Sequence, residues 1–325
     1  MLYQVKILII SFIVGVIFSL IVIPIIRRKN IGQNEREDGP RTHLKKQGTP
    51  TMGGIAIMLS LLAISGVLYY KYRIQEPEVC KNLLVLAITT ACFGVIGFID
   101  DFKKVVLGNT KGLKPAYKML GLLIVATAFT IYMLKFLNIG TDIIIPFAKT
   151  TVTLPIFVYI PFSILVMLAT TNAINLTDGI DGLSTSVTTI ILTCLTVIGI
   201  IFGVKEIVLI GTSLIGICLA FLLFNLNPAK VFMGDTGSLL LGGAVSIMAI
   251  YLKMPLLLLI IAIIPVLETL SDIIQVLHYK RTGNRIFKMA PLHHHFELSG
   301  WSENKVVSIF SLITMIACFI GLFAI

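Results

Sequence analysis

Long apolar segments recur along the whole chain, separated by short polar connections. A bilayer core needs roughly 20 apolar residues for each helical span, and ten segments approach that length. They predict helices near 3–26, 52–72, 82–99, 116–137, 156–174, 184–203, 206–224, 236–252, 254–277 and 305–324. The pattern predicts an all-α integral membrane protein with about ten transmembrane helices, forming a single polytopic domain over residues 1–325.

Composition and charge support a position in the lipid bilayer. Apolar residues make up 57% of the chain and charged residues 13%, whereas a soluble domain carries about 25% charged residues. A net charge of +10 could indicate nucleic-acid binding. In membrane proteins, however, the common cause of such a charge is a cytoplasmic surplus of Lys and Arg. We therefore expect no nucleic-acid partner.

The distribution of basic residues predicts the orientation. Eighteen of the 26 Lys and Arg residues lie in or beside five alternate connections, which are 27–51, 100–115, 175–183, 225–235 and 278–304. The positive-inside rule places these connections in the cytoplasm and both termini outside. The outside connection 138–155 has the composition of a small hairpin.

Two groups of acidic and amide side chains occur in these inside connections. Asp100 and Asp101 end the third predicted helix. Adjacent carboxylates repel one another, and a divalent cation relieves that repulsion, although such a pair can also simply end a span. Four more such residues lie within ten positions at the end of the fifth predicted helix: Asn172, Asn175, Asp178 and Asp181. Polar density of this kind is costly in lipid and tends to be functional. Asp181 alone could be a helix cap.

The segment Asn225 to Ser238 has the composition of a phosphate site. Gly234 permits close backbone approach, and the helix that follows offers free N–H groups to an anion. Asp235 would be a cap or a metal ligand there. Phe232 can stack on a nucleobase. The GxxxxGK[ST] spacing of a nucleoside-triphosphate loop is absent.

Histidines and lysines supply candidate phosphate-binding groups. His293, His294 and His295 can donate hydrogen bonds to phosphate, or they can be an ordinary loop tract. One lysine, Lys45 or Lys46, could neutralise a phosphate, whereas the basic segment around them could equally bind lipid headgroups. Glu268, Asp272 and Gln275 have i, i+4 and i+7 spacing and therefore share one helix face. We expect this face to point toward the site.

Five motifs occur together and in order: residues 48–54, the Asp100–Asp101 pair, and residues 175–183, 225–238 and 291–297. This set resembles the phospho-N-acetylmuramoyl-pentapeptide transferases of the polyprenyl-phosphate N-acetylhexosamine-1-phosphate transferase superfamily. Within that superfamily, the Pro-x-His-His-His-Phe-Glu tract is typical of this branch. The resemblance covers essentially the whole chain.

The resemblance implies a Mg²⁺-dependent reaction of UDP-MurNAc-pentapeptide with undecaprenyl phosphate that yields lipid I and UMP for peptidoglycan synthesis. It also implies a ten-helix homodimer in the lipid bilayer of the bacterial inner (plasma) membrane, with its active site facing the cytoplasm. Asp235 is then the expected Mg²⁺ ligand with Asn175, and Asp100 is the expected base. Asp101 would assist placement of the metal or lipid, and His294 would stabilise the phosphates. The expected substrate-binding residues are Lys46, Thr51, Asn172, Asn175, Leu176, Asp178, Asp181, Asn225, Phe232, Gly234, Gln275, His293 and His295.

Other functions remain open at this point. A relative that transfers GlcNAc-1-phosphate for teichoic acid or polysaccharide synthesis shares the aspartate motifs. A secondary transporter would also carry intramembrane acidic residues, but it would place them at the bilayer midplane. Direct attack and a covalent aspartyl-phosphate route are both compatible with the residues.

Overall fold

The computed structural model describes residues 2–28, 46, 48–105, 107, 112–137, 139–148 and 150–325. Within these ranges, the regular structure is helical apart from one short hairpin. The elements are α1 (Leu2–Arg28), α2 (Gly54–Tyr72), α3 (Pro77–Val105), α4 (Pro115–Phe136), β1 (Asp142–Ile145), β2 (Thr150–Thr153), α5 (Ile156–Thr177), α6 (Leu183–Ile201), α7 (Lys205–Asn225), α8 (Gly234–Tyr251), η2 (Pro255–Leu257), α9 (Leu258–Ile261), α10 (Ile263–Thr282), α11 (Leu292–Glu297) and α12 (Glu303–Phe323).

The membrane class predicted from the sequence is confirmed, and a helix occurs at each of the ten predicted segments. Among the described residues, eight helices are long and apolar enough to cross a membrane, or nine when the bent pair at 255–282 counts as one span. The difference from ten lies in α8, which begins with polar Asp235, Thr236 and Ser238. This helix is enclosed by protein, so its surface need not suit lipid.

The core of the bundle is built around α8. Every residue from Thr236 to Tyr251 is buried, and α8 packs against α2, α3, α5 and α6. Close packing needs small residues at the contacts, as is common between membrane helices. A Cβ on Gly54 would lie 2.1 Å from the backbone N of Gly237, so α2 and α8 touch through their backbones there.

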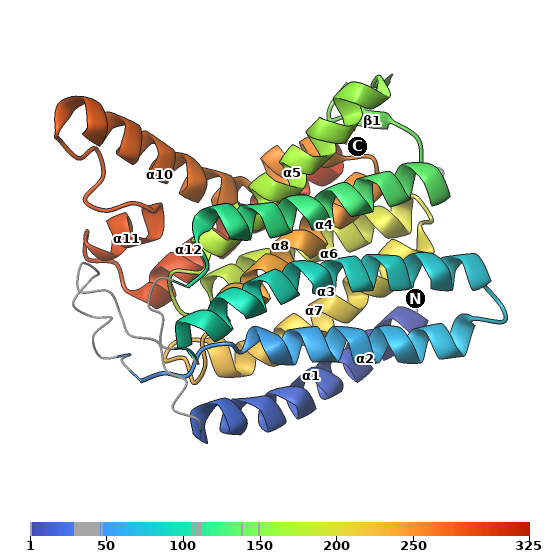
Figure 1. Ribbon diagram of the computed structural model, residues 1–325, viewed down its shortest axis with the longest axis horizontal. Helices are drawn as coiled ribbons and strands as arrows, with labels where there is room; N and C mark the ends of the chain where they lie inside the picture. The colour runs from blue at the N-terminus through green and yellow to red at the C-terminus, as the bar shows by residue number, and fades with distance from the viewer. Residues whose placement is uncertain are drawn as a thin grey trace.

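The two ends of the bundle differ in what they carry. Both termini lie at one end, and the loops that hold the aspartate motifs lie at the other (Figure 1). The predicted hairpin at 138–155 is confirmed as the antiparallel pair β1–β2. Its turn meets the C-terminus, where the Phe147 N–H donates to the Ala324 carbonyl at 2.7 Å. The hairpin and the C-terminus thus lie at the end of the bundle opposite the aspartate motifs (Figure 1).

The long helix α10 leaves the bundle at an angle. It is bent by 83° relative to the helical segment 255–261 and projects away from the other helices, with α11 beside it (Figure 1). The face of α10 that carries Glu268 turns toward α11 and binds His293 there. The expectation that residues 268, 272 and 275 share a face directed at the functional motifs agrees with this packing.

Candidate functional site

The acidic site is centred on the first turn of α8. Asp101, at the end of α3, accepts hydrogen bonds from the backbone N–H groups of Asp235 at 3.1 Å and Thr236 at 2.8 Å, and from the Thr236 hydroxyl at 2.6 Å. A carboxylate at this position satisfies free N–H groups and meets the positive end of the helix dipole. Asp101, and not Asp235, therefore caps α8.

The Asp235 carboxylate faces away from that cap and receives cationic and amide donors. Lys104 and Lys118 approach one carboxylate oxygen at 2.9 and 3.0 Å, and Asn175 donates to the other at 2.8 Å. Asn175 also donates to the Ser238 hydroxyl at 2.7 Å. The Lys118 ammonium, from the start of α4, thus lies on the Asp235 carboxylate.

Asp100 completes this acidic group from the last turns of α3. Its side chain is 2% exposed. It pairs with Lys104 at 2.5 Å and accepts from the Leu113 N–H at 2.6 Å. Two neighbouring carboxylates require positive charge between them, and Lys104 supplies it here by contacting both.

Two glycines allow α3 and α8 to approach closely enough to form this site. A Cβ at Gly97 would lie 2.1 Å from the Asp235 carbonyl oxygen, a separation that real atoms do not reach. Gly234 has a φ of +73°, in the region that glycine adopts without strain. A Cβ at Gly234 would lie 2.7 Å from an Asp101 carboxylate oxygen. The turn before α8 therefore needs glycine for both reasons.

A second charged cluster joins four segments that are far apart in sequence. The Lys46 ammonium contacts Asp181 at 2.7 Å and Glu303 at 2.6 Å. Asn227 donates to both carboxylates, at 3.0 and 3.3 Å, and the Ala229 N–H donates to Asp181 at 3.0 Å. Burial lowers the pKa of Lys46, but its hydrogen bonds to Asp181 and Glu303 outweigh this and raise the pKa above its usual value.

The cap interpretation of Asp181 is wrong. Gly182 stands at the N-cap of α6 with a φ of +75°, and the Asp181 carboxylate instead binds Lys46, Asn227 and the Ala229 N–H. The sequence also gave no reason to select Glu303, because an acidic residue in the first turn of an apolar helix is favourable for the dipole alone. Lys45 lies outside the described residues.

Asp178 lies at the end of α5, close to both clusters. Burial, together with the negative charges of Asp235, Asp101 and Asp181, raises its pKa well above the usual carboxyl value. This carboxyl group therefore prefers its protonated form, or a cationic or hydrogen-bonding ligand in the position that faces it.

The first histidine of the 293–295 tract joins α11 to α10. The fully buried His293 interacts through Nδ1 with Glu268 at 3.1 Å, and its backbone N–H donates to the same carboxylate at 3.2 Å. Its Nε2 has no hydrogen-bond partner among the described residues. A Cβ at Gly179 would lie 2.1 Å from this Nε2, so the imidazole reaches the turn that carries Asp178.

Three further predicted residues shape the same region. His294 contacts Glu297 through Nδ1 at 2.9 Å, and His295 Nδ1 accepts from the Lys288 N–H at 3.1 Å. The Gln275 side-chain oxygen accepts from two backbone N–H groups, of Ile286 and Phe287, and its amide donates to the Phe287 carbonyl. Gln275 therefore holds the loop before α11, and its predicted role in substrate binding stays a prediction.

The remaining predicted residues lie around the acidic site or on its supports. Asn225 is buried and bonds to the Thr185 hydroxyl and the Val231 carbonyl. Phe232 pairs through its backbone with Pro50 and Gly53. The Thr51 hydroxyl would be 3.1 Å from a Cβ on Gly234.

Asn172 is turned toward α4. Its amide donates to its own helix at Leu168 and to the sulfur of Met119. Leu176 is half-buried in the last turn of α5. Neither residue bonds to the carboxylates of the acidic site in the part of the chain that the structure describes.

The donor set of the acidic site suits a magnesium ion bound together with phosphate. The described ranges contain no cluster of three His, Cys, Asp or Glu side chains arranged to hold a metal. Mg²⁺ usually takes one or two carboxylates and completes its shell with phosphate oxygens and water. Asp235 supplies one such carboxylate, and the two ammonium groups on one of its oxygens show that this position attracts cations.

Known families match this chain along most of its length. The glycosyl transferase family 4 model matches residues 83–253, and phospho-N-acetylmuramoyl-pentapeptide-transferase signature 1 matches residues 46–58. The phospho-N-acetylmuramoyl-pentapeptide-transferase of Clostridium botulinum (strain Alaska E43 / Type E3) is 47% identical over 317 residues, covering 98% of this chain and 95% of the relative. The protein of that name from Acetivibrio thermocellus is 46% identical over 323 residues, covering 99% and 95%.

Proposed function

The chain belongs to the phospho-N-acetylmuramoyl-pentapeptide-transferase family, and we propose that it transfers phospho-MurNAc-pentapeptide from UDP-MurNAc-pentapeptide to undecaprenyl phosphate. The products are lipid I and UMP. The observation that carries this assignment is identity of 47% along nearly the whole chain to transferases of that name. The signature at residues 46–58 favours this branch over the GlcNAc-1-phosphate transferases.

In this reaction, an oxygen of the lipid phosphate attacks the phosphorus nearest the sugar, and the bond from that phosphorus to UMP breaks. Both substrates are anionic, so the site must supply positive charge. Lys104 and Lys118 supply it beside Asp235. Direct attack requires no covalent enzyme intermediate, and the buried Asp100, which is already paired with Lys104, fits a base better than a nucleophile.

Asp235 would hold Mg²⁺, with Asn175 beside it. When bound, the ion neutralises charge on the pyrophosphate as UMP departs. Asp100 would accept the last proton of the lipid phosphate. The second pKa of a phosphate monoester is about 6. Near neutral pH, therefore, only a part of the lipid phosphate molecules still carry this proton and need the base. Asp101 would act by keeping the first turn of α8 in place.

The remaining residues would bind and orient the two substrates. His294 and His295 would donate to the pyrophosphate, and the raised pKa of Asp178 suits a carboxyl group that meets the nucleoside. Phe232 is half-buried and could stack on uracil. Lys46 would reach a phosphate only by leaving Asp181 and Glu303, so its first role is to hold those two carboxylates together.

The proposal places the acidic end of the bundle in the cytoplasm and both termini outside, in the bacterial inner membrane. The excess of basic residues in the connections at this end supports that orientation. A homodimer is part of the same proposal. A membrane transporter is disfavoured, because the acidic groups lie at helix ends and not at mid-span.

Release of UMP in detergent tests the assignment. The purified full-length protein, given undecaprenyl phosphate and Mg²⁺, should release UMP from UDP-MurNAc-pentapeptide and leave UDP-GlcNAc intact. Chelation by EDTA should stop release, and added Mg²⁺ should restore it. The opposite sugar preference would move the chain to the GlcNAc-1-phosphate branch, and no UMP release from either donor would remove the enzymatic assignment.

A further inference from the structure

The fully buried pair of Glu268 and His293 joins α10 to α11 beside the acidic site. The Nδ1 atom of His293 lies 3.1 Å from one oxygen of the Glu268 carboxylate, and the backbone N–H of His293 donates to the other oxygen at 3.2 Å. Neither side chain has exposed surface. Two contacts with one carboxylate fix both the position and the rotation of the imidazole.

The Glu268 carboxylate also determines which ring nitrogen of His293 carries the proton. An ionised carboxylate can only accept hydrogen bonds, so the Nδ1 atom that faces it is an N–H donor. The hydrogen bond of one ring nitrogen sets the state of the other. In the neutral ring, Nε2 therefore has a lone pair and no hydrogen.

The Nε2 atom is packed against the turn that carries Asp178. A Cβ on Gly179 would lie 2.1 Å from Nε2, so the glycine hydrogen at that position points toward this nitrogen. A lone pair accepts such a Cα–H contact, whereas a hydrogen on Nε2 would be pressed against it. Nε2 has no hydrogen-bond partner among the described residues, which agrees with this packing. The ring can lie so close to Gly179 only in the tautomer that Glu268 selects.

We propose that Glu268 is a positioning residue for the sugar-nucleotide donor. By keeping the proton of His293 on Nδ1, it allows the imidazole to support the turn at Asp178 and Gly179. The Glu268 carboxylate is buried and bonds to His293, so it acts on the donor through the imidazole. This inference rests on the proposed function, in which Asp178 meets the nucleoside.

The effect of Glu268 should be confined to the donor substrate. Asp178 belongs to the turn that His293 supports. Asp100, the base proposed for the lipid phosphate, instead lies at the end of α3 and bonds to Lys104 and the Leu113 N–H. None of these contacts involves α10 or α11. Displacement of the turn should therefore raise the KM for the donor and leave the KM for undecaprenyl phosphate unchanged.

Glu268→Gln tests this role with almost the same side-chain shape. The amide oxygen can still accept from the His293 backbone N–H, but the amide NH₂ would donate to Nδ1 and move the ring proton to Nε2. UMP release by the full-length protein in detergent with Mg²⁺ measures the result. We expect the KM for UDP-MurNAc-pentapeptide to rise roughly tenfold, comparable to the loss of one hydrogen bond. Calorimetric titration with UMP, without the lipid acceptor, should show a similar loss of affinity.

Gly179→Ala changes the same contact from the other side. The φ of Gly179 lies outside the left-handed region, so alanine suits the backbone, but its Cβ would displace the imidazole. This variant should also raise the KM for the donor. The double variant Glu268→Gln/Gly179→Ala should be no worse than the more affected single variant. Additive effects would mean that Glu268 does not act through the contact of His293 with Gly179.

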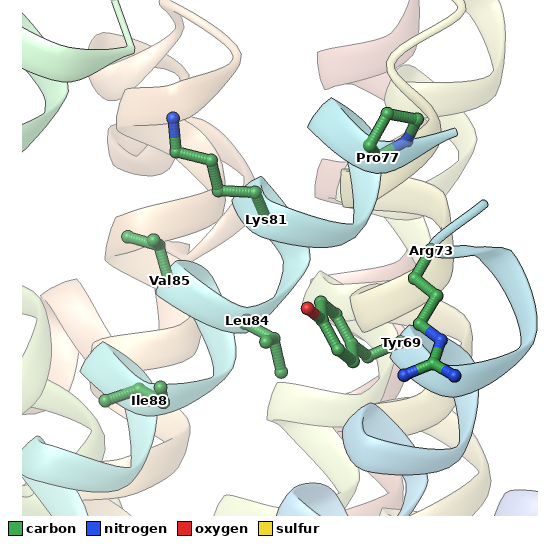
Figure 2. Close-up of a pocket in the computed structure, with 7 residues that line it drawn as sticks. All are labelled: Tyr69, Arg73, Pro77, Lys81, Leu84, Val85 and Ile88. Carbon is green, nitrogen blue, oxygen red and sulfur yellow. The ribbon is translucent and has the colours of Figure 1, made fainter. Parts of the chain in front are cut away.

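Two carboxylates at the opposite end of the bundle provide controls for the loss of one negative charge. Glu206, at the start of α7, bonds to Tyr251, so Glu206→Gln changes a hydrogen-bonded carboxylate as Glu268→Gln does. Glu78 is exposed and pairs at 3.9 Å with Lys81, which lines a pocket of about 400 Å³ between α2 and α3 (Figure 2). Glu206→Gln is expected to lower the melting temperature, but neither control should change either KM.

A wild type that releases no UMP would remove the proposed function itself. An active wild type, with an unchanged donor KM in a folded Glu268→Gln variant, would overturn the role of Glu268 alone. A parallel rise of both KM values would also overturn it, because general loosening of the structure has that effect. Nitrogen-15 NMR of the histidine-labelled wild type needs no folded variant. It should find the proton of His293 on Nδ1, and a proton on Nε2 would overturn the inference.

Discussion

Asp101 on α3 accepts two hydrogen bonds from Thr236 on α8, one from the backbone N–H at 2.8 Å and one from the hydroxyl at 2.6 Å. A third bond comes from the Asp235 N–H. The carboxylate of one helix therefore fixes the first turn of another, and that turn carries the carboxylate assigned to the metal. Asp101 therefore acts on the site by holding the first turn of α8 in position.

Asp101→Asn should therefore lower stability as well as activity. In the variant, the side-chain NH₂, a donor, would replace a carboxylate oxygen that accepts from a backbone N–H. Hydrogen bonds to charged groups contribute about 1.5–3 kcal/mol each, and such bonds would be lost. We expect a lower melting temperature in detergent for Asp101→Asn, because the carboxylate accepts three hydrogen bonds that hold the first turn of α8. Equal melting temperatures for wild type and Asp101→Asn would contradict the capping role.

Asp235→Ala and Asp100→Ala should each abolish transfer while the protein still inserts and purifies normally. Both carboxylates face the cluster of Lys104 and Lys118 and not the helix cap. Loss of a group that stabilises developing charge costs roughly 10²–10³-fold in turnover, and loss of the metal ligand should cost more. UMP release measures the effect, and turnover near the wild-type rate in either variant removes that residue from its role.

Gly97→Ala should separate α3 from α8 and disturb the acidic site. The added Cβ would lie 2.1 Å from the Asp235 carbonyl oxygen, so the two helices must move apart. We expect reduced thermal stability together with reduced UMP release. Gly66→Ala is the matched control, because a Cβ there meets nothing within 4 Å, and replacing glycine by alanine within a helix is favourable. Unchanged activity in Gly97→Ala would argue against this close contact.

Breaking the Lys46–Asp181–Glu303 cluster should be costly. Lys46→Met leaves two mostly buried carboxylates without their cation, and such a loss typically costs roughly 3–5 kcal/mol. The double variant Lys46→Met/Glu303→Gln removes one of those carboxylates and should recover part of the stability. Unfolding in denaturant compares the variants. Strict additivity of the two changes would mean that the residues do not interact.

Asp178 should make the ligand-free protein less stable as pH rises. Its pKa is raised in the folded state, so the folded protein binds more protons than the unfolded chain above about pH 4, and stability falls as the pH rises toward the folded pKa. Asp178→Asn has no such proton to lose. Its melting temperature should therefore exceed that of the wild type increasingly with pH across this window, while UMP release falls. A constant difference between the two proteins would exclude this titration.

Much of the architecture follows from local patterns. Each of the ten apolar segments is a helix, and the hairpin at 142–153 is where turn and β-branched residues predicted it. Helix formation in lipid is imposed on each apolar segment separately, because the backbone must satisfy its own hydrogen bonds. Because consecutive spans alternate in direction, the order of the connections and the positions of the basic residues were enough to assign the motifs to one end of the bundle.

Contacts between distant segments could not be predicted in this way. The cap of α8 by Asp101, the two lysines on Asp235 and the pairing of Lys46 with Glu303 join residues 117 to 257 positions apart. Asp181 illustrates the consequence, because its type suggested a helix cap, whereas it is the centre of an ion cluster. The contacts of Gln275 with the loop before α11 could not be predicted from the sequence either.

The sequence by itself determined the membrane class, the helices, the family and the set of polar motifs, because hydrophobicity and motif order are local properties of the chain. Only the tertiary structure decided which carboxylate supports a helix and which faces the cations. That division depends on how closely α3 and α8 pack at Gly97 and Gly234, and packing between helices is a property of pairs of surfaces, which no single segment encodes.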